Sequence, residues 1–210
     1  IGGVSSGDII QYYVAAQDVN SNVATNPTGG SGVNPPGTTP PGIPNQYSVV
    51  TGISGTFTVG TTGTYATLTA AVTDINNREI TGPVILNLID NQYLSETFPI
   101  TLNANSGSSS TNTLRIQQAT GVAAEFDNTV GNGMLILNGF DYLIIDGSPT
   151  LDALGNKNLN NNTDGFPNLT LSQTSSTAPI ITLQNDATNN RISNCIIRSD
   201  YTFTSSGLFV

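Results

Sequence analysis

The sequence predicts an all-β chain whose larger part is a parallel β-helix. Two blocks repeat the same order of elements, because residues 134–138 align with 180–184 and residues 143–146 align with 191–194. Each block holds an apolar strand, a stretch rich in turn residues, and a second short strand. Such strands are too short to bury their apolar side alone, so the next repeat must stack on them, with parallel strands about 4.8 Å apart.

Polar side chains end these strands. Asn138 and Gln184 end the first strand of each block, and Asp146 and Asn194 end the second. Asn and Asp tolerate left-handed backbone and bond their own backbone, which suits corners, and amides on successive coils can also bond one another as a ladder. The alternative is an antiparallel sandwich with two-residue Asn-Gly turns, for which Asn138 and the following glycine are a candidate.

Length and charge narrow the classes of function. A chain of 210 residues allows one large or two small domains. With 14 acidic against 5 basic residues and a net charge of −9, the chain has no basic stripe for phosphates. We therefore expect no nucleic-acid partner and no binding to an anionic membrane surface. No run approaches the ~18 apolar residues of a membrane span, so we expect no membrane insertion.

Composition favours a secreted or cell-surface β-protein. Charged residues make up only 9% of the chain, so solubility rests on abundant Asn, Thr, Ser and Gly. The sequence opens on Ile1 without a signal peptide and closes on an apolar strand at 208–210, which predicts a piece of a longer exported polypeptide. Cys195 is the only cysteine, so no internal disulfide forms, and we interpret it as a small buried core residue.

Residues 1–50 begin with a strand at 8–18. Alternation places four of its side chains on one face: Ile10, Tyr12, Val14 and Ala16. Residues 18–22 are a turn by composition. Residues 26–44 hold most of the prolines and predict a stiff exposed loop or linker, followed by a closing strand at 47–50.

The pattern Tyr12-x-Val14-x-Ala16-x-Asp18, followed by an Asn-bearing turn, resembles the penultimate strand of an immunoglobulin-like or fibronectin type III module. This resemblance covers some fifteen residues. It implies that residues 1–50 are the C-terminal part of such a β-sandwich, with its Pro-rich loop at 26–44 and its earlier strands upstream.

From residue 53 the pattern changes. Residues 56–59 predict a strand and residues 60–64 a turn. Apolar residues then recur at i, i+3, i+4 and i+7, which is the buried face of a short helix: Leu68, Ala71, Val72 and Ile75. Thr67 is the expected N-cap of this helix.

Two patterns resemble the entrance of the pectin-lyase-like right-handed β-helix family: Tyr65-x-x-Leu68-x-x-Ala71-Val72 in the helix, and Tyr93-x-x-Glu96-x-x-x-Ile100 beyond the next aliphatic strand. The resemblance implies that residues 53–210 are the N-terminal coils of a right-handed parallel β-helix, truncated at the C-terminus. The short helix would cap the N-terminal end, where an uncovered edge invites pairing with other chains. The expected fold is thus an all-β chain in which the last strands of an immunoglobulin-like β-sandwich precede this capped β-helix.

Pectin-lyase-like folds host lyases, hydrolases and esterases, whose sites stack acids on consecutive coils. The acids available here are Asp141, Asp146, Asp152, Asp164 and Asp186. None falls opposite another in the aligned repeats, since Asp146 faces Asn194 and Asp141 faces Asn189. No motif of a named lyase or hydrolase appears, so we interpret these acids as turn caps and expect no catalytic residue.

Two further stretches carry possible sites. Residues 152–170, rich in Asn and Gly, predict a loop with glycosylation sequons at 161–163 and 168–170, a triplet frequent by chance in this composition. Asp18, Asn20 and Asn22 have the alternating oxygen spacing that starts a calcium loop. They lack the Gly and the distant Glu of an EF-hand, so a plain Asx turn is favoured over calcium, and no cofactor is expected.

The two resemblances together imply a large secreted bacterial surface protein of the adhesin type, exported in some lineages by the type IX route linked to gliding motility. We expect a non-catalytic structural or adhesive segment. Its partners would be an extracellular glycan or surface ligand, or neighbouring modules and the export machinery of the same envelope. One alternative is a carbohydrate-active enzyme, a polysaccharide lyase or glycoside hydrolase, with its catalytic coils beyond residue 210. Another is a passive stalk or spacer.

Overall fold

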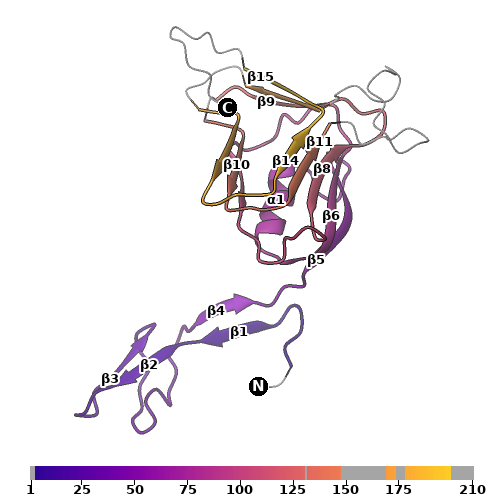
Figure 1. The fold of residues 1–210 in the computed structure, drawn as a ribbon. Helices are drawn as coiled ribbons and strands as arrows, with labels where there is room; N and C mark the ends of the chain where they lie inside the picture. The colour runs from indigo at the N-terminus through magenta and orange to yellow at the C-terminus, as the bar shows by residue number, and fades with distance from the viewer. Residues whose placement is uncertain (1–2, 131, 148–168, 174–177, 200–210) are drawn as a thin grey trace. The chain divides into compact units, whose positions relative to one another are not determined.

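The structure is a computed structural model that describes residues 3–130, 132–147, 169–173 and 178–199. These residues form mostly strands and one helix, which confirms the all-β prediction (Figure 1). Within the same ranges no helix has the length and apolar composition needed to cross a membrane. The chain divides into two units, Ile1–Thr51 and Gly52–Val210.

The first unit contains two antiparallel strand pairs. Strand β1 (Ile9–Tyr12) pairs with β4 (Asn45–Ser48), and β2 (Val14–Gln17) pairs with β3 (Val23–Asn26). The turn between β2 and β3 and the closing strand were both predicted, although β3 itself was not. The Pro-rich stretch is mostly exposed, but it also pairs with itself where Ser31 and Thr39 exchange backbone hydrogen bonds of 2.9 and 2.8 Å.

The prediction of one continuous strand over residues 8–18 is wrong in two respects. The strand is interrupted at Tyr13, whose hydroxyl donates to the Gly37 carbonyl. The predicted face is also the more exposed one in β2, because Ala15 and Gln17 are half-buried whereas Val14 and Ala16 are exposed. The Pro-rich loop explains the reversal, since Gly37 lies against Ala15 and Tyr13 on the opposite face.

The second unit is built from three parallel sheets. The largest has the order β14-β11-β8-β6-β5, and the others have the orders β13-β10-β7 and β15-β12-β9. From β7 onward the chain visits the three sheets in the same cyclic order three times. The strand bounds are Ile53–Val59 (β5), Ile80–Leu88 (β6), Ile100–Asn103 (β7), Leu114–Gln118 (β8), Ala124–Asn128 (β9), Leu135–Asn138 (β10), Leu143–Asp146 (β11), Leu169–Gln173 (β12), Ile181–Gln184 (β13), Arg191–Ser193 (β14) and Cys195–Ser199 (β15).

All strand pairs of this unit are parallel across the described residues, so the antiparallel-sandwich alternative does not apply to it. Strands β9 and β12 were not predicted. Leu169 and Thr170, assigned from the sequence to the long loop, are the first residues of β12. The rest of that predicted loop, the sequon at 161–163 and the strand at 208–210 lie outside the described residues.

The repeat alignment is right for one strand and off by one residue for the other. Strand β10 faces β13 with Leu135 opposite Ile181, as the sequence predicts. Strand β11 instead faces β14 with Ile144 opposite Arg191. The amide of Asn190 explains the slip, because its Oδ1 accepts from the Leu143 backbone N–H at 2.8 Å. A side chain therefore takes the place of the backbone that the alignment had put opposite Leu143.

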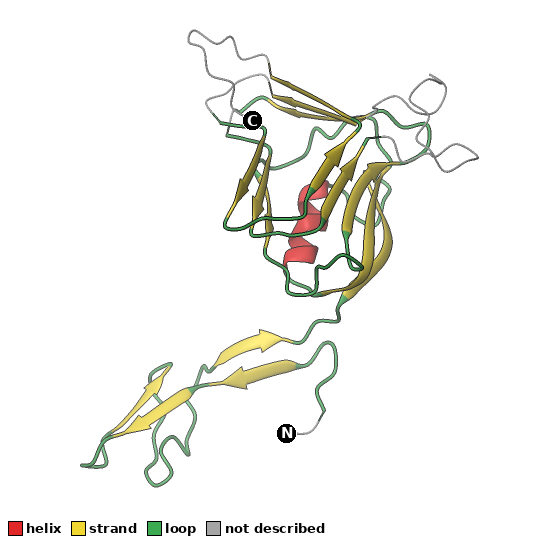
Figure 2. Cartoon of the chain, viewed as in Figure 1, coloured by secondary structure: helices red, strands yellow, loops and turns green. Residues whose placement is uncertain are grey.

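The helix α1 (Leu68–Asn76), red in Figure 2, forms as predicted. Its four predicted apolar residues are all buried, and the Thr67 hydroxyl accepts from the Ala70 backbone N–H at 3.0 Å. The helix contacts β5 and β7, so its apolar face joins the core between the sheets. The local periodicity and the cap residue together account for this element.

Candidate functional site

The polar side chains of the second unit form inter-strand ladders. Asn103, Asn138 and Gln184 are in register on neighbouring strands. The Asn138 Nδ2 donates to Asn103 Oδ1 at 2.9 Å, and Gln184 Nε2 donates to Asn138 Oδ1 at 3.4 Å. This confirms the predicted amide ladder, and further links join Gln117 to Asn87 at 3.3 Å and Asn128 to Gln173 at 3.4 Å in the other two sheets.

Corners between strands use left-handed residues, as the Asn and Asp content predicts. Asn185, Asn189 and Asn194 have φ values of 54°, 56° and 55°. Asp186 is also left-handed, with φ 61°, in the turn after β13. A short polar side chain makes this backbone conformation tolerable because it can bond locally.

One amide closes the edge of β7 in the way that a neighbouring strand would. Asn76, at the end of α1, donates from Nδ2 to the Thr101 carbonyl at 2.7 Å and accepts at Oδ1 from the Asn103 N–H at 2.9 Å. An edge strand otherwise presents unpaired backbone groups to other chains. The helix therefore closes this edge with hydrogen bonds as well as with apolar packing.

The predicted acids lie in separate hydrogen-bonded positions. Asp146 is fully buried, with its Oδ2 2.9 Å from Arg115 Nη1 and its Oδ1 accepting from Asn194 Nδ2 at 3.0 Å. Asp141 Oδ1 accepts from the Thr188 N–H at 2.6 Å and from its hydroxyl at 2.8 Å. These two carboxylates thus hold neighbouring coils together, as the turn-cap interpretation expects. Asp152 and Asp164 lie outside the described residues.

The register modifies one detail of that interpretation. Asp146 is opposite Ser193, and not opposite Asn194 as the alignment predicts. Asn194 nevertheless reaches the carboxylate, because its left-handed backbone follows the end of β14. Arg115 reaches it from the preceding strand of the sheet, where Gln117 is the residue directly opposite Asp146. Sequence analysis did not identify Arg115 as a partner.

Residues 18–22 form an Asx turn between β2 and β3. Asp18 Oδ1 accepts from the backbone N–H groups of Asn20 at 2.9 Å and Asn22 at 2.8 Å, and its Oδ2 accepts from Asn22 Nδ2 at 2.7 Å. The Asn22 side-chain bond, followed by its backbone bond, lowers the pKa of the Asp18 carboxyl. Across the part of the chain that the structure describes, no three His, Cys, Asp or Glu side chains converge as metal ligands.

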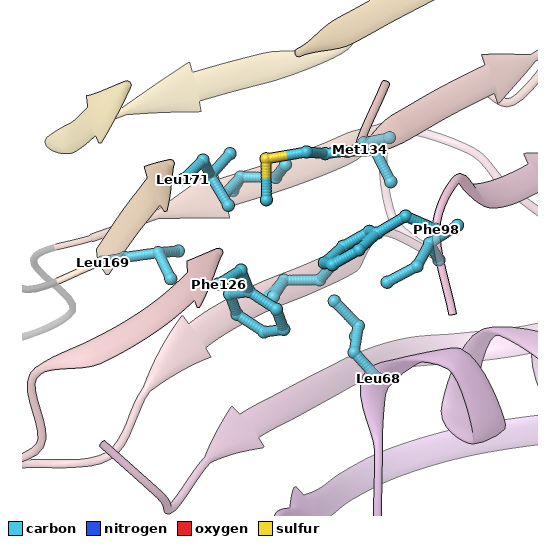
Figure 3. Close-up of a pocket in the computed structure, with 10 residues that line it drawn as sticks. Leu68, Phe98, Phe126, Met134, Leu169 and Leu171 are labelled. Carbon is cyan, nitrogen blue, oxygen red and sulfur yellow. The ribbon is translucent and has the colours of Figure 1, made fainter. Parts of the chain in front are cut away.

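The core of the second unit contains an apolar cavity of about 30 Å³. Figure 3 shows its lining, which includes Leu68 of the helix and side chains from each of the three sheets: Phe98, Phe126, Met134, Leu169 and Leu171. A bound water needs two to four polar partners, and the lining side chains supply none. We therefore interpret this space as a packing gap in the core and not as a site for chemistry.

Glu96 gives the helix a second N-terminal cap. Its Oε1 accepts from the Leu68 N–H at 2.6 Å, and its Oε2 accepts from the Thr69 N–H at 2.8 Å and the Thr69 hydroxyl at 2.6 Å. A carboxylate suits this position because the first helical N–H groups are unpaired and the helix dipole is positive there. The sequence pattern included Glu96, but its role required the tertiary structure.

We expect Glu96→Gln to lower the free energy of unfolding by about 1 to 2 kcal/mol, because the charge that faces the helix N-terminus is lost. Urea unfolding followed by circular dichroism measures the change. The control is Glu79→Gln, an exposed glutamate beyond the helix end, for which we expect a change below about 0.5 kcal/mol. Equal losses in the two variants would contradict the capping role.

Two tyrosine hydroxyls tie the N-terminal part of this unit together. Tyr93 is 4% exposed, donates to the Val59 carbonyl at 2.7 Å and stacks on Phe126 with ring centroids 4.4 Å apart. Tyr65 donates to Asp74 Oδ2 at 2.6 Å. Burial raises the pKa of Tyr93 to about 12, and burial followed by the Asp74 bond raises the pKa of Tyr65 to about 12.

Alkaline pH should therefore destabilise this unit. A tyrosine ionises near pH 10 when unfolded, so the stabilisation is complete below pH 10 and is lost as the pH rises toward about 12. We expect Tyr93 to contribute about 2 to 3 kcal/mol to this loss. Urea unfolding measured at several pH values checks it, and Tyr93→Phe should show a shallower decline. Tyrosinate absorbance showing all seven tyrosines titrating near pH 10 would refute the expectation.

The described residues define an all-β chain with parallel sheets joined by amide and carboxylate hydrogen bonds. Comparisons with protein-family models, with curated proteins and with solved structures find no match to it.

Proposed function

We propose that the second unit is a right-handed parallel β-helix capped by α1, and that the chain is a non-catalytic structural and adhesive segment of a large secreted cell-surface protein. The cyclic order in which the chain visits three parallel sheets supports the coil. The α1 contacts with β5 and β7 support its role as a cap. An experimental structure of the chain would test the handedness directly.

The observation that carries the functional proposal is the use of polar side chains between coils. Ladders such as Asn103–Asn138–Gln184 and carboxylates such as Asp141 and Asp146 join one coil to the next. A stack tied in this way is a stiff scaffold whose outer surface repeats from coil to coil. Such a surface suits the repeated units of an extracellular glycan, which is the partner we propose.

The first unit is proposed to be the last part of an immunoglobulin-like or fibronectin type III module. Its two antiparallel pairs and the hairpin turn at Asp18 support this assignment. A module of that kind followed by a β-helix fits a surface protein exported by the type IX route, with neighbouring modules and the export machinery as further partners. The net charge of −9 and the low charged fraction of 9% agree with an exported surface.

A glycan-binding assay tests the adhesive role. The 210-residue chain, immobilised in its folded form, is presented with a panel of extracellular polysaccharides, and heat-unfolded chain serves as the control. We expect saturable binding without cleavage, and the same binding in calcium and in chelator, because Asp18, Asn20 and Asn22 would act as a turn and not as a metal site. Release of new sugar ends would favour the carbohydrate-active enzyme instead. An absence of binding to every polysaccharide and surface protein tried would favour the passive spacer.

The size and place of the native polypeptide test the surface assignment. Antibodies raised against this chain would be used on whole cells, on protease-shaved cells and on culture supernatant. We expect a surface-exposed polypeptide much larger than 21.8 kDa. A protease-resistant band confined to the cell interior would overturn the assignment.

A further inference from the structure

The last coil of the second unit leaves its inward side chains uncovered. Leu183 on β13 is 54% exposed, whereas Leu137 and Leu102, in register on the two preceding strands, are both 0% exposed. Exposure of a large aliphatic side chain at an inward position leaves apolar area in water that each earlier coil has buried. The column therefore lacks a cover at this end.

The other two sheets repeat the observation. Ile192 on β14 is 36% exposed, against 3% for Ile145 below it. Ile197 on β15 is 48% exposed, against 8% for Leu171 below it. All three sheets thus end in the same way, which makes the last coil a continuous apolar edge across the described residues.

The opposite end of the stack is closed. Asn76 occupies the β7 edge through the Thr101 carbonyl and the Asn103 N–H. At β5 the Tyr65 N–H donates to the Thr58 carbonyl at 3.0 Å. The register of β5 also shifts between Ile53 and Gly55, which bends an edge strand away from partners. A further parallel strand therefore has a place at the β13 end and not at the β5 and β7 end.

We propose that the edge of β13 is a docking surface for one more parallel strand, and that the occupant is the chain's own segment 207–210. This segment lies outside the described residues, and its assignment comes from sequence and topology. After β15 the cyclic order returns to the sheet of β13. The sequence Gly-Leu-Phe-Val at 207–210 repeats the order of Gly, apolar, apolar, β-branched found in Gly-Met-Leu-Ile at 133–136, which leads into β10.

The repeat fixes a register. Leu135 and Ile181 are opposite one another, so the matching residue of the segment, Phe209, faces inward above Ile181. Val210 then faces outward beside Thr182. The aromatic ring covers apolar area at the end of the β13 column. This inference rests on exposure, register and sequence, and does not depend on the adhesive role proposed above.

Cysteine cross-linking tests the register. In a Cys195→Ser background, which keeps a donor for the Ser193 carbonyl that Cys195 bonds at 3.1 Å, the pair Thr182→Cys and Val210→Cys is introduced. Neighbouring parallel strands place such residues about 5 Å apart, within the range of a disulfide. We expect an intramolecular disulfide on mild oxidation. The control pair Thr182→Cys and Phe209→Cys, with side chains on opposite faces, should stay reduced under the same conditions.

Hydrogen exchange gives an independent readout. Shortening the chain to residue 206 should speed exchange of the β13 amides, Ile181–Gln184, at least severalfold, while the β10 amides keep their protection. Unchanged exchange in β13, or equal cross-linking of both cysteine pairs, would overturn the proposal. A disulfide formed only between two molecules would also overturn it, because a second copy of the chain would then occupy the edge.

Discussion

Replacing Phe126 with alanine is expected to lower the free energy of unfolding of the second unit by about 3 to 5 kcal/mol. Phe126 is 2% exposed, and its ring stacks on Tyr93 at a centroid distance of 4.4 Å with 15° between the planes. It also borders the apolar cavity (Figure 3). Loss of the ring enlarges an existing space, and the cost of such a change rises with the cavity that remains.

Urea unfolding followed by circular dichroism and tyrosine fluorescence measures this loss, since the chain has no tryptophan. The matched control is Phe57→Ala, which removes the same ring from a half-buried position where it meets Tyr65 at 5.8 Å. We expect that loss to be clearly smaller, because less apolar area is returned to water. A Phe126→Ala loss below about 1 kcal/mol would mean that the three sheets close around the gap.

The elements that the sequence predicted well depend on neighbours in the chain. The helix follows from Leu68, Ala71, Val72 and Ile75, with Thr67 as its cap, and each of these contacts is complete within a few turns of backbone. The ladder of the β7, β10 and β13 sheet was also predicted, because the repeats there align without a gap. A local pattern or an ungapped repeat is sufficient information for such elements.

The errors arise where a side chain replaces backbone or where a loop decides the face. Asn190 bonds the Leu143 N–H, so the register of β11 against β14 slips by one residue relative to the alignment. In the first unit, Gly37 packs beside Ala15, so the opposite face of β2 is the exposed one. Neither effect has a signature in periodicity, because each depends on residues distant in the chain.

The candidate site divides in the same way. Sequence analysis identified Asp146 as a structural residue at a strand end, and its burial with two partners agrees with that interpretation. Its partner Arg115 lies on the preceding strand of the sheet, diagonal to the carboxylate. That pairing requires the stacking register, which single-sequence reasoning did not supply. Strand β9 carries a period-2 pattern in Ala124, Phe126 and Asn128 that was available in the sequence.

Loss of the Arg115 side chain is the second change for which we expect a large effect. The Asp146 carboxylate is 0% exposed and lies 2.9 Å from the Arg115 guanidinium. Removal of one partner of a buried ion pair leaves a charge in a poorly solvated place, so Arg115→Ala should cost about 3 kcal/mol or more. The matched control is Arg198→Ala, because the Arg198–Glu125 pair is 56% and 33% exposed and an exposed pair contributes below about 1 kcal/mol.

A double-mutant cycle separates the ion pair from the packing of the arginine stem. Asp146→Asn keeps the shape of the side chain and removes its charge, so the Arg115→Ala change should cost less in that background than in the native chain. We expect a coupling free energy of about 1 to 3 kcal/mol, measured by urea unfolding of the four proteins. A coupling near zero, or an Arg198→Ala loss as large as that of Arg115→Ala, would show that the Asp146 carboxylate is stabilised without the Arg115 charge.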